Sequence, residues 1–139
     1  MKNLFVLAIL TLSVTVNGQS ILGKWVTYDD ETNERKGLIL IYKKNQTFFA
    51  KIIKNYDGEN DAICEECEGE KRNKPIIGLV IIENLKKNGN VYEGGTILDP
   101  ETGDVYSCYL ELISANKLKV RGYMGFSIFG RTQYWQRVK

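Results

Sequence analysis

The chain has 139 residues, with 19 Lys or Arg against 17 Asp or Glu, so its formal net charge is +2. This length suits one domain with a hydrophobic core, and the balanced charge excludes the general attraction to nucleic acid that strongly basic domains have. The chain contains three cysteines and no histidine. It therefore lacks the commonest general base of enzymes and the commonest metal ligand.

The first 18 residues have the pattern of a secretory signal peptide. Lys2 supplies a positive charge, residues 4–14 form an apolar stretch, and small or tolerated residues precede Gly18. The apolar stretch is shorter than the roughly 20 residues of a membrane-spanning helix. The sequence therefore predicts cleavage near Gly18, secretion into the periplasm or the extracellular space, and no membrane span. Residues 19–139 then form a single domain.

Runs rich in β-branched and aromatic residues alternate with turn residues along this domain, and no stretch keeps a helical period for three turns. They predict eight strands, at Lys24–Tyr28, Gly37–Lys43, Thr47–Lys54, Ile76–Glu83, Val91–Leu98, Val105–Ile113, Lys117–Tyr123 and Thr132–Val138. Tight turns at Asn88-Gly89 and Asp99–Gly103 favour antiparallel hairpins between consecutive strands, because Gly and Asn accept positive φ.

A meander of eight strands has two exposed edges, and closure into an up-and-down barrel removes both. A β-sandwich is the alternative. Gly23 and Trp25 lie at the start of the first strand and Arg137 at the end of the last, so an indole and a guanidinium can meet at one end of a barrel. This arrangement resembles the lipocalin signature. We therefore expect an all-β, antiparallel, lipocalin-like barrel with these three residues at its closure.

One long loop and one buried thiol are expected within the barrel. The sixth strand alternates between a polar and an apolar face, and Cys108 lies on the apolar one. The segment from about Asn55 to Pro75 is long for a compact domain, and such loops usually carry function, here as a lid over the barrel mouth. Its acidic residues have spacings like those of an EF-hand, but Ala62 stands where that motif needs glycine.

Four groups of residues, in a fixed order, carry a resemblance to a known family. They are Cys64-x-x-Cys67-x-Gly69, Lys74-Pro75-Ile76-x-Gly78-Leu79, Gly94-Gly95-x-Ile97-x-Asp99-Pro100-x-x-Gly103, and Arg121-Gly122-Tyr123-x-Gly125 followed by Gly130-Arg131-Thr132-Gln133-x-Trp135-x-Arg137. Together they resemble the bacterial family called domain of unknown function 2147, over Gly23 to Arg137. The resemblance implies an exported, lipocalin-like β-barrel and no established activity.

The cysteines allow several readings. In an oxidising compartment Cys64 and Cys67 can form a small disulfide ring that pins the lid, and a bond from either one to Cys108 is the alternative. Redox catalysis is disfavoured, because Glu65 and Glu66 oppose formation of a thiolate. A zinc site would have three sulfur ligands and no histidine. We expect a Cys64–Cys67 disulfide, no metal site and no cofactor.

The glycine-rich connection between the last two strands is the candidate binding site. Tyr123, Phe126 and Phe129 can contact an apolar ligand, while Arg121 or Arg131 can donate to an anion. In the alternative interpretation, these aromatic residues complete the core of a tight turn. An eight-stranded barrel is either filled by side chains or holds one small ligand.

The sequence predicts binding rather than catalysis. No serine lies in a G-x-S-x-G motif, and adjacent glutamates such as Glu65 and Glu66 point apart on an extended loop. We expect a non-catalytic module for a small apolar or amphipathic molecule, with no catalytic residues and no nucleic-acid partner. The alternative is an interaction or inhibitor protein of the cell envelope that acts through a surface loop.

Overall fold

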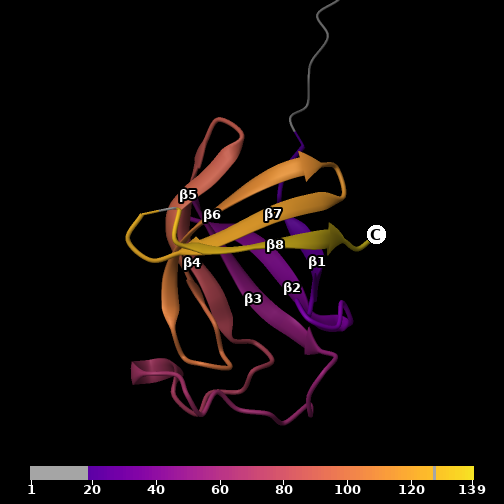
Figure 1. Ribbon diagram of the computed structural model, residues 1–139, viewed down its shortest axis with the longest axis vertical. Coiled ribbons are helices and arrows are strands. Elements are labelled where there is room, and N and C mark those ends of the chain that lie inside the picture. Colours follow the sequence, from indigo (N-terminus) through magenta and orange to yellow (C-terminus); the bar gives the residue numbers. More distant parts are fainter. Residues whose placement is uncertain (1–18, 127) are drawn as a thin grey trace, which may run out of the picture.

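Eight antiparallel strands form one closed barrel in the computed structural model, which describes residues 19–126 and 128–139 (Figure 1). The strands are β1 (Gly23–Tyr28), β2 (Arg35–Lys44), β3 (Thr47–Asn55), β4 (Val80–Asn88), β5 (Val91–Leu98), β6 (Val105–Ser114), β7 (Lys117–Tyr123) and β8 (Gly130–Arg137), with one 3-10 turn, η1 (Gly69–Lys71). The predicted fold class is confirmed, and the predicted leader lies outside the described residues. No helix in the described part of the chain is long and apolar enough to cross a membrane.

The fourth strand differs from its prediction. The sequence placed it at Ile76–Glu83, whereas β4 begins at Val80. Gly78 has φ +94°, and the Leu79 N–H donates to the Ile76 carbonyl at 3.1 Å, so these residues form a turn. The apolar residues before Val80 led to the prediction of a strand, because hydrophobicity alone does not reveal that Gly78 has a positive φ.

The two ends of the barrel have different connections. At one end, the closed end, two-residue turns at 45–46, 89–90 and 115–116 join the strands, and both termini of the barrel lie there. At the other end, the mouth, longer connections span 29–34, 56–79, 99–104 and 124–129. The segment between β3 and β4 extends from the mouth at the bottom of Figure 1. Loops able to carry a site therefore gather at the mouth.

Large inward-facing side chains fill the closed half of the barrel. Among the fully or nearly fully buried ones are Trp25, Ile41, Phe48, Leu85, Tyr92, Leu110 and Leu118. The rings of Phe48 and Tyr92 meet edge to face, with centroids 4.9 Å apart. Cys108 is also fully buried, on the face of β6 that its alternation predicted.

The barrel closes between β1 and β8, which share only two residue pairs, Trp25 with Arg137 and Val26 with Gln136. Side chains strengthen this short ladder. The Arg137 guanidinium lies 4.3 Å from the centre of the Trp25 ring. It also donates hydrogen bonds to three backbone carbonyl oxygens, those of Ser20, Leu22 and Ala115. One arginine thus ties together the start of β1, the end of β8 and the turn between β6 and β7.

Gly23 and Trp25 complete this closure. Gly23 has φ +123°, and a Cβ atom there would lie 3.2 Å from an Arg137 nitrogen, so glycine suits both the backbone conformation and the space. Trp25 is fully buried, and its indole N–H donates to the Ile21 carbonyl at 2.8 Å. The structure therefore brings Gly23, Trp25 and Arg137 together at the closed end.

Candidate ligand-binding site

A cavity of about 690 Å³ opens at the mouth, a volume within the usual range of small-molecule sites. Its walls carry the aliphatic side chains of Ile39, Ile52, Ile81, Ile97 and Val120. The barrel is therefore filled in its closed half and hollow in its outer half.

The hollow half follows from residue size along the strands. Inward positions near the mouth carry Thr27 on β1, Gly37 on β2 and Gly122 on β7, whereas the next inward positions of the same strands carry the larger Trp25, Ile39 and Val120. Gly37 and Gly122 contribute no side chain to this half of the barrel, and the Ile97 side chain packs against Gly122. The floor is Trp135, whose indole N–H donates to Gln133 at 3.4 Å.

Two ion pairs cross the rim of the cavity. Lys36 Nζ lies 2.6 Å from Glu101 Oε1, joining β2 to the β5–β6 loop. Arg131 Nε lies 2.9 Å from Asp30 Oδ2, joining β8 to the β1–β2 loop. Partial burial opposes the charge on Lys36, but the hydrogen bond and the attraction to Glu101 outweigh it and raise the pKa of Lys36. Lys36 and Arg131 therefore already have acidic partners, while the third basic residue that lines the cavity, Lys54, lies 4.8 Å from the centre of the Tyr56 ring.

The segment between β3 and β4 forms a lid on one side of the mouth, where Ile63 and Ile76 line the cavity. A disulfide joins Cys64 to Cys67, whose Cα atoms are 5.4 Å apart. The part of the lid that contains this disulfide packs on the β5–β6 loop, because Cys64 Sγ lies 3.6 Å from the Pro100 carbonyl oxygen.

A glycine permits this contact between the lid and the β5–β6 loop. Gly103 has φ +77°, and a Cβ atom there would meet the Glu66 carbonyl oxygen. Any side chain at this position would force the two loops apart. The disulfide therefore holds the lid in a shape that fits the neighbouring loop.

We predict how the three thiols will react. Burial raises the pKa of Cys108 to about 12, so it carries almost no thiolate at pH 8. Titration with a chromogenic disulfide should find no reactive thiol in the native protein, one after denaturation, and three after denaturation with reduction. Three reactive thiols in denatured but unreduced protein would contradict the Cys64–Cys67 bond.

The sequence-predicted binding residues fall into two groups. Tyr123, Phe129 and Arg131 line the cavity at its rim. Arg121 does not line the cavity, because it lies between the inward-facing positions Val120 and Gly122 on β7 and therefore points outward. On the outer face its guanidinium donates a hydrogen bond to the Thr132 hydroxyl at 3.0 Å. Phe126 does not line the cavity either.

The connection between β7 and β8 holds its apolar side chains in solvent. Phe126 is 78% exposed and Phe129 is 65% exposed, and Met124 and Ile128 are similarly open. The interpretation that these residues complete the core is therefore wrong. Backbone hydrogen bonds from Met124 to Phe129 and from Phe129 to Phe126 shape the connection without burying them.

Sequence reasoning did not name the aliphatic walls of the cavity. Ile39 and Ile52 lie in strands whose inner face the period-two alternation identifies, whereas in β5 an irregularity between Tyr92 and Gly95 shifts the alternation before Ile97. The signal that could have found the cavity is Gly37 and Gly122 at inward positions near the same end. Within the residues that the structure describes, no three Cys, Asp or Glu side chains group as a metal site would need.

The comparisons with known proteins agree with this fold. A solved structure, protein HP1028 from Helicobacter pylori, described as belonging to the lipocalin family, superposes with a TM-score of 0.78 at 20% sequence identity. The alignment covers 88% of this chain and 85% of that one. A search of curated proteins found no match. Residues 23–137 match the family model described as uncharacterized protein conserved in bacteria (DUF2147), so the chain belongs to the DUF2147 family.

Proposed function

We propose that this protein is an exported carrier or sensor that binds one small apolar or amphipathic molecule in the barrel cavity. The observation that carries the proposal is the cavity of about 690 Å³, walled by aliphatic side chains and open at the mouth. Burial of apolar ligand surface there would supply the affinity, and the function needs no catalytic step. The lipocalin-like fold supports the proposal by analogy.

Export is part of the proposal. The pattern of residues 1–18 is typical of a cleaved leader. The Cys64–Cys67 disulfide suits the oxidising compartment to which such a leader directs a chain.

The rim favours a ligand whose polar end is neutral or positively charged. Lys36 and Arg131 are paired with Glu101 and Asp30, so an anionic group would have to displace a carboxylate from each. Asp57 and Asp99 also line the rim and would repel an anion. Thr27 and Gln133 also line the mouth, where Thr27 hydrogen-bonds to the Gly37 backbone and Gln133 to Asp30 and Trp135.

Native mass spectrometry of protein purified from its own host tests the proposal. We expect a co-purified small molecule at one per chain that organic solvent extracts. The emptied protein should then bind the neutral fluorescent probe N-phenyl-1-naphthylamine more tightly than the anionic probe anilinonaphthalene sulfonate. Absence of both a co-purified molecule and probe binding would refute the proposed function.

The exposed β7–β8 connection favours a second candidate, contact with a protein of the cell envelope. Met124, Phe126 and Ile128 present apolar surface that monomeric proteins usually keep small. The same native mass spectra decide between the two candidates, because a captured protein without a small molecule favours this one.

A further inference from the structure

The two ends of the barrel carry opposite charge. The closed end consists of residues 19–24, 43–48, 86–93, 111–119 and 136–139, and contains nine Lys or Arg against two Glu, a net charge of +7. The mouth consists of residues 28–36, 54–80, 98–105, 123–126 and 128–131, and contains seven Lys or Arg against 14 Asp or Glu, a net charge of −7. A chain of nearly zero net charge is thus strongly polarised along its barrel axis.

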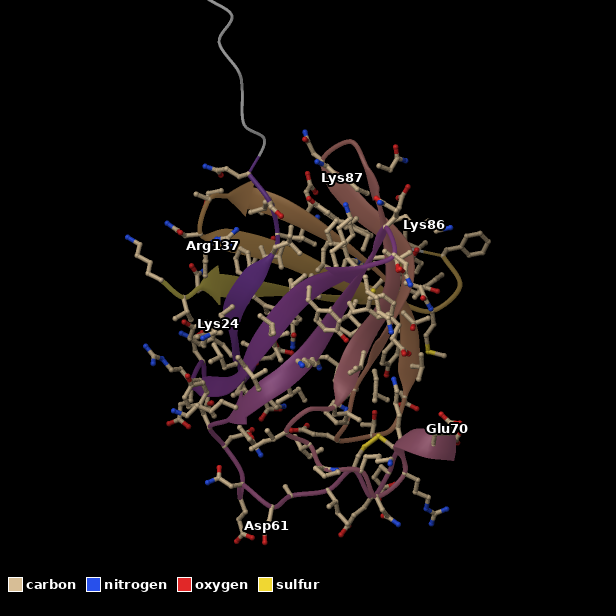
Figure 2. The ribbon with its side chains drawn as sticks, turned by 180° about the vertical axis from the view of Figure 1, so that it is seen from behind. Lys24, Asp61, Glu70, Lys86, Lys87 and Arg137 are labelled. Carbon is tan, nitrogen blue, oxygen red and sulfur yellow. A yellow bond between two sulfur atoms is a disulfide. The ribbon has the colours of Figure 1, made fainter. Side chains whose placement is uncertain are left out.

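Figure 2 shows this division directly. Lys86, Lys87 and Arg137 lie in the upper part of the view and Asp61 and Glu70 in the lower part, while Lys24 lies between them, near mid-height. The five segments that form the closed end are distant in sequence, and only the strand order brings them together.

The positive charge at the closed end is not neutralised within the protein. Among the described residues, the three ion pairs are Lys36 with Glu101, Lys71 with Glu83, and Arg131 with Asp30, and each uses a basic residue of the mouth. No lysine of the closed end belongs to any of them. This end therefore keeps a positive field that reaches about one Debye length, about 10 Å at 0.1 M salt, into solution.

The closed end also presents apolar side chains among its lysines. Its turns have two residues each, so no long loop keeps a flat partner away. Leu22, Ile113 and Val138 are 39%, 50% and 38% exposed there. Basic residues with interspersed apolar ones suit the interface of an anionic bilayer, whereas a soluble polyanion offers nothing for the apolar ones to contact.

The predicted leader joins the barrel at this same end. Gln19 and Ser20 lie beside Leu22, Asn116 and Arg137. A chain still attached to a membrane through residues 1–18 during export would therefore emerge next to the closed end. During export, the closed end would therefore lie nearest the membrane, and its positive charge suits an anionic membrane surface.

From these observations we infer that the closed end docks on the surface of an anionic phospholipid bilayer. The lysines contact lipid phosphates, and Leu22, Ile113 and Val138 rest among the head groups. The acidic mouth is repelled by the same surface, so the cavity faces away from the bilayer. This inference concerns a surface separate from the cavity and stands or falls independently of ligand binding.

Vesicle sedimentation with the exported protein tests the inference. Vesicles of about one part phosphatidylglycerol to two parts phosphatidylcholine should bind the protein at about 0.1 M salt and release it at about 0.5 M, because salt screens the attraction. Vesicles of phosphatidylcholine alone should not bind it. The triple variant K44Q/K86Q/K87Q should lower the partition coefficient about 100-fold, since each lysine near such a surface contributes about fivefold.

The matched control is R35Q/R72Q/K74Q, which removes the same charge from exposed positions at the mouth. It should bind at least as well as the unaltered protein, and thermal unfolding should show that both variants are folded. Four results would overturn the inference: no binding to anionic vesicles, equal binding to neutral vesicles, equal losses in the two triple variants, or binding to a DNA duplex as tight as to the vesicles.

Discussion

Trp25→Ala is expected to lower the free energy of unfolding by about 3–5 kcal/mol, a large share of the total stability of a domain this size. Trp25 is fully buried at the closed end, and its ring supports the Arg137 guanidinium at 4.3 Å. Because β1 and β8 share only two residue pairs, the closing strand pair depends on these side chains more than any other pair does. Urea unfolding followed by far-ultraviolet circular dichroism measures the loss.

Arg137→Ala should cost about 2 kcal/mol, because three backbone carbonyls lose a charged donor and the Trp25 ring loses its cation. The double variant should cost less than the sum of the two, since both remove the same contact. Tyr134→Ala is the control: it removes a half-exposed aromatic residue from β8 and should cost under about 1 kcal/mol.

Equal effects of Trp25→Ala and Tyr134→Ala would contradict this account of closure. Additive effects of Trp25→Ala and Arg137→Ala would show that the two side chains act independently, and would remove the guanidinium–indole contact from the explanation.

The sequence predicted the barrel well because its evidence is local. Alternation along β6 identified the inner face that carries Cys108, and turn residues at Asn88-Gly89 located the hairpin between β4 and β5. The start of β4 was wrong because the positive φ of Gly78 converts an apolar run into a turn, which hydrophobicity does not show.

The candidate site was harder to predict, because a cavity is a property of the closed barrel rather than of any segment. Arg121 and Arg131 look alike in sequence, yet the first lies on the outer face of β7 and the second lines the rim. Phe126 and Phe129 were expected near the ligand or in the core, and only Phe129 reaches the cavity. The wall of Ile39, Ile52 and Ile97 becomes visible only when the strands are placed side by side.

The separation of charge between the two ends of the barrel was also hard to predict from the sequence. The acidic block between Asp57 and Glu70 is continuous, so it is plain in the sequence. The lysines of the closed end are spread over five segments that interleave with acidic ones along the chain. A net charge of +2 conceals them, and the barrel topology separates them from the acids.

Ile97→Trp is expected to weaken binding of N-phenyl-1-naphthylamine at least about tenfold, or about 1.4 kcal/mol or more. Ile97 lies on the cavity wall and packs against Gly122, so an indole there extends into the open half of the barrel and occupies the volume that the ligand would fill. Stability should change little, because the added atoms enter a cavity rather than a packed core. Fluorescence titration measures the affinity, and thermal unfolding measures the stability.

Ile113→Trp is the matched control, because it makes the same substitution at a half-exposed position on the closed end, outside the cavity. It should leave probe affinity within about twofold of the original, a difference of about 0.4 kcal/mol. If Ile97→Trp folds and binds the probe as tightly as Ile113→Trp does, the probe binds elsewhere. The exposed apolar residues of the β7–β8 connection would then be the next site to test, and the carrier function would lose its main support.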